Sequence, residues 1–182
     1  MSKLQKVAVL GGGSFGTVLA NLAASNGYKV SLWVRDSEQA LRINSEGANT
    51  PYHPELKLSE NILASDDLNE VVQDVSIVFI ATPSIIFEKI VNRLSNFIPE
   101  DAFLISCTKG ILENPFRLLS EVISKDCKNP IGVLSGPNLA KEIADNKIAG
   151  TVIASSKKDC LLYTSDAADD TLWVYQGGGG LL

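Results

Sequence analysis

Short apolar runs alternate along this chain with segments whose apolar residues recur at helical spacing. Most of the runs are continuous, which is typical of strands buried on both faces of a parallel sheet. We expect strands at residues 6–10, 28–34, 62–64, 76–81, 102–107, 131–134 and 151–154. We expect helices from 16 to about 26, 37 to about 44, 66 or 67 to 72, 84–97, 116–124 and 138 to about 146. This alternation predicts an α/β fold with a doubly wound parallel sheet.

The first expected strand leads directly into a glycine-rich turn, Gly11-Gly12-Gly13-Ser14-Phe15-Gly16. The sequence Gly-x-Gly-x-x-Gly between a strand and a helix is the fingerprint of a Rossmann-type dinucleotide site. Gly11 allows a tight turn, Gly13 leaves room for a pyrophosphate, and Gly16 allows close packing of helix on strand. The helix N-terminus then offers its N–H groups to the phosphates. The alternative is a glycine-rich turn without a ligand.

The end of the second strand is the next candidate, because the adenosine ribose of a dinucleotide lies there. Arg35 and Asp36 share this place, about twenty residues beyond the glycines. Asp36 suits the N-cap of the following helix, so we expect Arg35 at the strand tip. A guanidinium can bind a 2′-phosphate or stack on adenine. We therefore expect NADPH to be favoured and NADH to be tolerated; the alternative for Arg35 is an exposed arginine without a ligand.

Charge and cysteine content argue against several other classes of protein. The formal net charge of −5 disfavours a nucleic-acid partner and a basic membrane face. Cys107, Cys127 and Cys160 lie outside the spacing of metal ligands. We expect them to be reduced core thiols of a cytoplasmic protein, not disulfides or nucleophiles. No stretch of the sequence is long and apolar enough to predict a membrane span.

The alternation of strands and helices stops after about Asp159. The last residues are four consecutive glycines and two leucines, Gly177–Leu182. This composition is typical of neither a helix cap nor a core. We therefore expect a dinucleotide-binding domain at residues 1–159 and an irregular, non-native extension at 160–182. The alternative is a genuine irregular C-terminal segment.

Five blocks of sequence stand near the expected strand ends. They are Gly11–Thr17, Leu32–Arg35, Ala81–Ser84, Cys107–Ile111 and Leu134–Glu142. Together they resemble the bacterial NAD(P)-dependent glycerol-3-phosphate dehydrogenases, in register over residues 1 to about 159. The Thr-Lys-Gly and Ser-Gly-Pro-x-x-Ala-Lys-Glu patterns are more specific than the glycine loop. The resemblance implies interconversion of sn-glycerol 3-phosphate and dihydroxyacetone phosphate with NADPH or NADH, which feeds glycerophospholipid synthesis.

The resemblance also implies which residues contact the cofactor. Ser14 and Phe15 would line its pyrophosphate and adenine side, where the family commonly has tryptophan in place of Phe15. Arg35 would contact the adenosine ribose end. Lys109 would face the nicotinamide, and Ala140 would contact the cofactor from the next helix.

On the substrate side, the resemblance implies contacts from Lys109, Gly136 and Asn138. Serine or threonine is frequent at the position of Asn138, so its hydrogen bond can differ here. An ammonium at a strand's C-terminal turn can also attract substrate oxygens on physical grounds, although a solvated lysine is the alternative for Lys109. His53 lies in a loop rich in glycine and proline and is expected at the surface.

The chain departs from the family in its length. In the family a second, helical domain carries the lysine thought to move the proton at the hydroxyl carbon, together with further substrate-binding groups. We find no match to that domain or to that lysine in this sequence, and so no catalytic residue is assigned. Because hydride transfer needs a partner for the alcohol proton, we expect the chain alone to be nearly inactive. The resemblance implies a homodimer for the full-length protein.

Two other functions stay open at this point. One is a different two-domain NAD(P)-dependent reductase of the hydroxyacid or ketopantoate type, against which the Thr-Lys-Gly and Ser-Gly-Pro blocks argue. The other is a non-catalytic module that senses NAD(P) and regulates a partner.

Overall fold

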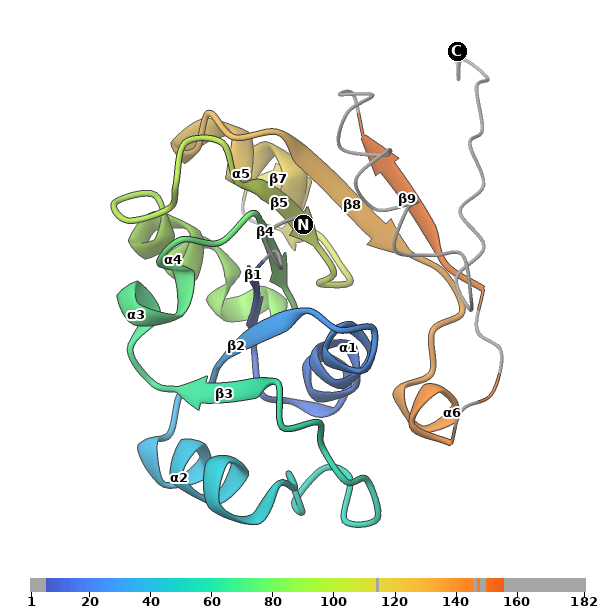
Figure 1. Cartoon of the computed structure of the whole chain (residues 1–182). Coiled ribbons are helices and arrows are strands. Elements are labelled where there is room, and N and C mark those ends of the chain that lie inside the picture. The colour runs from blue at the N-terminus through green and yellow to red at the C-terminus, as the bar shows by residue number, and fades with distance from the viewer. Residues whose placement is uncertain (1–5, 114, 146, 148–149, 156–182) are drawn as a thin grey trace.

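The computed structural model describes residues 6–113, 115–145, 147 and 150–155 of the 182-residue chain. Within these residues the main feature is a seven-stranded sheet in the order β3-β2-β1-β4-β5-β8-β9 (Figure 1). Its strands are β1 (Lys6–Leu10), β2 (Lys29–Trp33), β3 (Ile62–Ser65), β4 (Ile77–Ile80), β5 (Phe103–Ser106), β8 (Ile131–Ser135) and β9 (Val152–Ser155). All neighbouring strands pair in parallel except β8 and β9. The predicted α/β fold is confirmed.

Helices cover both faces of this sheet. They are α1 (Ser14–Ser25), α2 (Ser37–Glu46), α3 (Leu68–Val72), α4 (Ser84–Leu94), α5 (Leu119–Asp126) and α6 (Ala140–Ala144). Two apolar cores result, because alternate residues of each strand point to opposite faces. Along β1, Val7 and Val9 belong to the core that α1 and α2 share, and Ala8 and Leu10 to the core that α3, α4 and α5 share. Burial on both faces explains why the strands are continuously apolar.

Local capping sets where two of the helices begin. The carboxylate of Asp36 accepts a hydrogen bond from the backbone N–H of Glu38 at 3.0 Å and so caps α2. Asp67 caps α3 in the same way, through the N–H of Asn69 at 2.9 Å. Gly47 then ends α2 with a φ of +62°, a conformation that favours glycine. The cap predicted at Asp36 is confirmed, and of the two starts left open for the next helix the structure has the one at Asp67.

The strand order places a topological switch between β1 and β4. From β1 the chain runs outward to β2 and β3, then returns across the sheet to β4 on the other side of β1. The carboxyl ends of β1 and β4 lie side by side, since the N–H of Ala81 donates to the carbonyl of Leu10 at 2.8 Å. The helices that follow these two strands lie on opposite faces, so a crevice opens between them.

The last strand differs from the prediction of a wholly parallel sheet. β9 pairs antiparallel with β8, with Val152 opposite Ser135. The reason is that the chain returns directly to the end of β8: a Cβ on Gly136 would lie 2.4 Å from the carbonyl oxygen of Gly150. A strand that starts beside the end of its neighbour can only run antiparallel to it.

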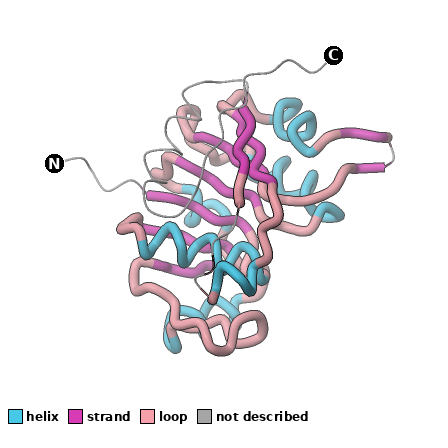
Figure 2. Tube along the Cα trace, turned by 90° about the vertical axis from the view of Figure 1, so that its right-hand side faces the viewer, coloured by secondary structure: helices cyan, strands magenta, loops and turns pink. Residues whose placement is uncertain are grey.

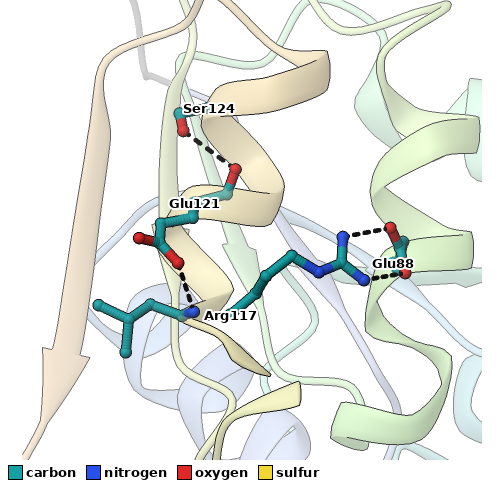
Figure 3. A network of polar contacts seen from close by, with 5 residues as sticks. Glu88, Arg117, Glu121 and Ser124 are labelled. Carbon is teal, nitrogen blue, oxygen red and sulfur yellow. Dashed lines mark hydrogen bonds and ion pairs between the residues drawn. The ribbon is translucent and has the colours of Figure 1, made fainter. Parts of the chain in front are cut away.

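The helix predicted for residues 116–124 is wrong at its start. Phe116–Arg117 forms a short strand, β7, antiparallel to β6 (Leu112–Glu113), and α5 begins at Leu119. Figure 2 shows this hairpin projecting from the main sheet. Two polar contacts hold its end (Figure 3): the Glu121 carboxylate accepts from the N–H of Leu118 at 2.7 Å, and Arg117 forms a bidentate ion pair with Glu88 of α4 at 2.7 and 2.9 Å.

Helix α6 is also shorter than predicted. It spans Ala140–Ala144, so the expected start at Asn138 is wrong, and the expected end at Asn146 lies outside the described residues. Asn138 lies two residues before the helix, and its buried side chain accepts a hydrogen bond from the Thr151 hydroxyl. The predicted extension at 160–182, with Cys160, also lies outside the described residues.

The ion pair between Arg117 and Glu88 predicts a pH-dependent contribution to stability. The hydrogen bond from Arg117 lowers the pKa of Glu88 below its ordinary value of 4.5. A lowered carboxyl pKa stabilises the fold above the unfolded value, and this contribution is lost as the pH falls through the folded value. Glu88→Gln should therefore lower the melting temperature slightly at pH 7, because the pair is only partly buried and solvent weakens it. The difference from the unaltered chain should shrink towards zero as the pH falls below 4.5; a constant difference would contradict the assignment.

Candidate functional site

A cleft of about 660 Å³ lies at the carboxyl edge of the sheet, at the switch between β1 and β4. This volume falls within the usual range for small-molecule sites. Its walls are the glycine loop and the loops that follow β2, β4, β5 and β8, together with part of α2 and residues 51–52. The residues are Gly11, Gly12, Gly13, Ser14, Phe15, Trp33, Arg35, Asp36, Gln39, Arg42, Pro51, Tyr52, Ala81, Thr82, Pro83, Ile86, Cys107, Thr108, Lys109 and Asn138.

The glycine loop is closed behind and open towards the cleft. A Cβ on Gly11, whose φ is +125°, would lie 2.5 Å from the Ala81 carbonyl oxygen, and one on Gly16 would lie 1.9 Å from the Gly11 carbonyl oxygen. A Cβ on Gly12 would lie 2.3 Å from Val34. A Cβ on Gly13 would meet nothing within 4 Å. The tight turn predicted at Gly11, the open space at Gly13 and the close packing at Gly16 match this geometry. Contact of a pyrophosphate with Gly13 stays a prediction.

The first turn of α1 is available to an anion. Gly13 occupies the N-cap, so no side chain caps the helix, and the first turn contains no acidic residue. The N–H groups of a helix's first turn have no partner within the helix, and the dipole favours negative charge there. This end of α1 opens onto the cleft through Ser14 and Phe15, as the sequence predicts.

A loop that the sequence placed at the surface supports the glycine loop from behind. The prediction for His53 is wrong: its side chain is 8% exposed, and its Nε2 lies 2.9 Å from the Ser14 carbonyl oxygen and 3.0 Å from Ser14 Oγ. Asn49 donates to the Gly12 carbonyl at 3.0 Å and to Thr17 Oγ1 at 2.7 Å. Glycine and proline in this loop indicate a turn, but they carry no information on what the turn packs against.

One end of the cleft carries two guanidinium groups. Arg35 follows β2 at the predicted position, while Asp36 is engaged as the cap of α2. Arg42, from the second turn of α2, also lines this end and lies 3.8 Å from Glu38. Sequence reasoning missed Arg42, although its position seven residues after Arg35, on a helix that starts at the strand tip, is a usable signal. The two arginines make this end suitable for a phosphate.

Lys109 lies at the other end, after β5. Its Nζ donates to the Gly136 carbonyl oxygen at 3.5 Å, so two predicted substrate residues are neighbours. The adjacent Thr108 hydroxyl lies 3.1 Å from the Ile80 carbonyl and 2.8 Å from the Thr82 carbonyl, which holds the ends of β4 and β5 together. The ammonium therefore stands on a fixed turn.

Asn138 presents a buried donor beside this lysine. Its Oδ1 accepts a hydrogen bond from the Thr151 hydroxyl at 2.8 Å, which leaves the Nδ2 amide group to face elsewhere. That Nδ2 is buried and has no partner among the described residues, and Asn138 lines the cleft. Because an unpaired buried donor is costly, this amide group is the candidate donor at this end of the cleft.

Three predicted site residues lie outside the lining of the cleft. Gly16 is buried against Gly11, Gly136 lies behind Lys109, and Ala140 begins α6, which packs on α1. Gly16 therefore shapes the site rather than lining it. Contacts of Gly136 and Ala140 with a ligand stay predictions.

The two cysteines within the described part of the chain are unsuited to nucleophilic chemistry. Burial raises the pKa of the Cys107 thiol far above its usual range and that of Cys127 to about 11. Both are buried free thiols, as predicted. Within the described residues no group of three potential metal ligands occurs. No helix in that same part of the chain is long and apolar enough to cross a membrane.

Comparison with known proteins decides the family. A family model described as NAD-dependent glycerol-3-phosphate dehydrogenase N-terminus matches residues 6–161. The chain belongs to this family. The glycerol-3-phosphate dehydrogenase [NAD(P)+] of Alcanivorax borkumensis is 48% identical over 149 residues, which are 81% of this chain and 43% of that protein. The enzyme of the same name from Teredinibacter turnerae is 44% identical over 156 residues, 85% of this chain and 46% of that protein.

The fold agrees with this assignment. The crystal structure of glycerol-3-phosphate dehydrogenase from Coxiella burnetii superposes with a TM-score of 0.89 at 31% identity and covers 96% of this chain and 54% of that one. The chain spans less than half the length of the two curated relatives. Membership in this family confirms the resemblance drawn from the sequence blocks and argues against the hydroxyacid or ketopantoate type.

Two glycine substitutions should distinguish Gly16, which shapes the loop, from Gly13, which faces the cleft. Gly16→Ala forces a Cβ against the backbone of Gly11 and should lower the free energy of unfolding by about 1–3 kcal/mol or more. Gly13→Ala meets no atom, so its cost should not exceed about 1 kcal/mol, the preference for glycine over alanine at an N-cap. Its methyl group nevertheless enters the cleft.

The measurements are urea unfolding and NADPH titration of both variants. Gly13→Ala should fold normally and bind NADPH at least about tenfold more weakly, which is about 1.4 kcal/mol. Normal NADPH binding by folded Gly13→Ala would show that the phosphates do not approach the loop at this residue.

Proposed function

We propose that residues 6–155 form the NAD(P)H-binding half of a glycerol-3-phosphate dehydrogenase and one side of its substrate pocket. The observation that carries the proposal is one continuous cleft with three consecutive parts. The uncapped end of α1 lies in the middle, Arg35 and Arg42 lie at one end, and Lys109 and Asn138 lie at the other. Membership in the family and the names of the relatives support the reaction.

The cofactor is proposed to lie along the cleft with its pyrophosphate against Gly13 and the first turn of α1. The backbone N–H groups there hold phosphate oxygens without a side chain in between. Phe15 lines the same wall, and the guanidinium of Arg35 is suited to the adenosine ribose and to a 2′-phosphate. This arrangement favours NADPH over NADH.

The substrate is proposed to bind between Lys109 and Asn138. When bound, NAD(P)H supplies the hydride that converts dihydroxyacetone phosphate to sn-glycerol 3-phosphate. The Lys109 ammonium attracts the substrate's oxygens, and the buried Nδ2 of Asn138 donates a hydrogen bond to one of them. Thr151 holds that amide in place through its hydroxyl, so the donor is oriented before the substrate arrives.

We infer that proton transfer at the hydroxyl carbon and the remaining substrate contacts require groups outside residues 6–155. One observation supports this inference: the curated relatives are more than twice as long as the part of them that this chain matches. The full-length protein is proposed to act as a homodimer. The buried free thiols of Cys107 and Cys127 support a reducing, cytoplasmic location.

Calorimetric titration of the 182-residue chain with NADPH, and with NADH alongside, tests the cofactor site. We expect saturable binding of both, with NADPH bound more tightly. Arg35→Ala should weaken NADPH about tenfold or more and NADH less than about threefold, because the charge-assisted bonds to the 2′-phosphate are lost.

Arg93→Ala is the matched control for that titration. Arg93 is an exposed arginine in the last turn of α4 and does not line the cleft. The Arg93→Ala variant should leave the affinities for NADPH and for NADH unchanged. Equal losses of NADPH and NADH in Arg35→Ala would remove the assignment of Arg35 to the 2′-phosphate.

A turnover measurement tests the proposal that part of the active site lies outside residues 6–155. The 182-residue chain should reduce dihydroxyacetone phosphate at least about 100-fold more slowly than the full-length Alcanivorax borkumensis enzyme, because general acid–base catalysis contributes about that much or more. The assay follows NADPH oxidation at saturating cofactor. Comparable rates would place the whole catalytic machinery within this chain. Tight cofactor binding that is coupled to a change in the oligomeric state of the chain would instead favour a non-catalytic module that senses NAD(P).

A further inference from the structure

The only histidine of the chain, His53, contacts the residue that opens the dinucleotide-binding helix. Its ring lies in the turn between α2 and β3, 39 residues beyond Ser14 in sequence, and its side chain is almost wholly buried. One ring nitrogen, Nε2, reaches two atoms of Ser14: the carbonyl oxygen at 2.9 Å and Oγ at 3.0 Å. Neither the established family nor the sequence motifs account for this contact.

The carbonyl contact fixes the chemistry of the ring. A carbonyl oxygen can only accept a hydrogen bond, so Nε2 must carry the hydrogen. The hydroxyl oxygen of Ser14, Oγ, then accepts from the same Nε2–H. The hydrogen of this hydroxyl group is therefore left for donation to another acceptor. Ser14 lines the cleft at the start of α1, where an anion is expected.

We propose that His53 is a positioning residue that fixes the Ser14 hydroxyl as a hydrogen-bond donor to the pyrophosphate of the dinucleotide. The proposal rests on the proposed function, because it requires a dinucleotide in the cleft. Without His53 the serine hydroxyl is free to rotate and to bond with nearby backbone groups, as serine commonly does at helix ends. With His53 in place, the donor is oriented before the ligand arrives.

The turn that carries His53 is itself anchored to the glycine loop. The backbone N–H groups of Tyr52 and His53 donate to the Asn49 carbonyl at 3.0 and 2.9 Å. The Asn49 side chain in turn donates to the Gly12 carbonyl and to Thr17. Gln39 donates to the same Gly12 carbonyl at 2.7 Å and to Asn49 Oδ1 at 3.2 Å. The imidazole therefore has little freedom to move away from Ser14.

The first test compares two substitutions of the histidine in the 182-residue chain. His53→Leu removes the donor at similar volume and should raise the dissociation constants of NADPH and NADH by the same factor, about 5- to 10-fold. Both cofactors share the pyrophosphate, so both should suffer equally. His53→Gln carries an amide N–H at nearly the same reach and should restore most of the affinity.

A second pair of variants guards against a change in folding. If His53→Leu does not fold, the comparison is His53→Gln with His53→Asn, whose amide is one carbon shorter and should not restore binding. Circular dichroism establishes which variants are folded. Equal affinities of the Gln and Asn variants, or an unchanged affinity in folded His53→Leu, would overturn the role assigned to His53.

A double-mutant cycle with Ser14→Ala tests whether His53 acts through the serine. Once the hydroxyl is absent, His53→Leu should weaken NADPH by less than about twofold. If instead the two losses multiply, His53 does not act through Ser14. If the unaltered chain binds neither cofactor, the proposed function fails along with this proposal. If it binds both and His53→Leu binds equally well, the positioning role alone fails.

Discussion

The close approach of α1 to the end of β1 is the constraint on which the site depends. No side-chain atom fits between Gly16 and the Gly11 carbonyl, so the first turn of the helix lies directly against the strand end. This contact points the uncapped N-terminus of α1 along the carboxyl edge of the sheet. A wider separation would move the N–H groups away from the cleft, because a helix and its dipole turn as one rigid unit.

Another carbonyl group of the glycine loop is secured from behind. Gln39 and Asn49 both donate to the Gly12 carbonyl. A peptide plane whose carbonyl oxygen is held on one side must present its N–H towards the other. The supporting residues thus contribute to an anion site by ordering the backbone that forms it, without reaching the anion themselves.

Topology then brings distant segments to one edge. Parallel strands that cross over through helices place all their carboxyl ends together, so the loops after β1, β2, β4 and β5 meet although they are far apart in sequence. The antiparallel return of β9 adds a further element, because it sets Thr151 beside Asn138 and orients the buried amide. The cleft therefore combines the ends of the parallel strands with the Asn138 amide, which the residue before β9 holds in place.

The sequence by itself determined the α/β fold, the glycine loop, the cap at Asp36, and the places of Arg35 and Lys109 directly after strands of the sheet. These features follow from local rules: the period of apolar residues, the conformational freedom of glycine and the capping of helix ends. Only the tertiary structure decided the burial of His53, the direction of β9 and the start of α5 at Leu119. The first two depend on a partner far away in sequence: Ser14 for His53 and the end of β8 for β9. At α5 the local contact of Glu121 with the Leu118 N–H combines with the distant ion pair of Arg117 with Glu88. Local pattern carries no information on such partners, because the energy that selects them arises only once the sheet has assembled.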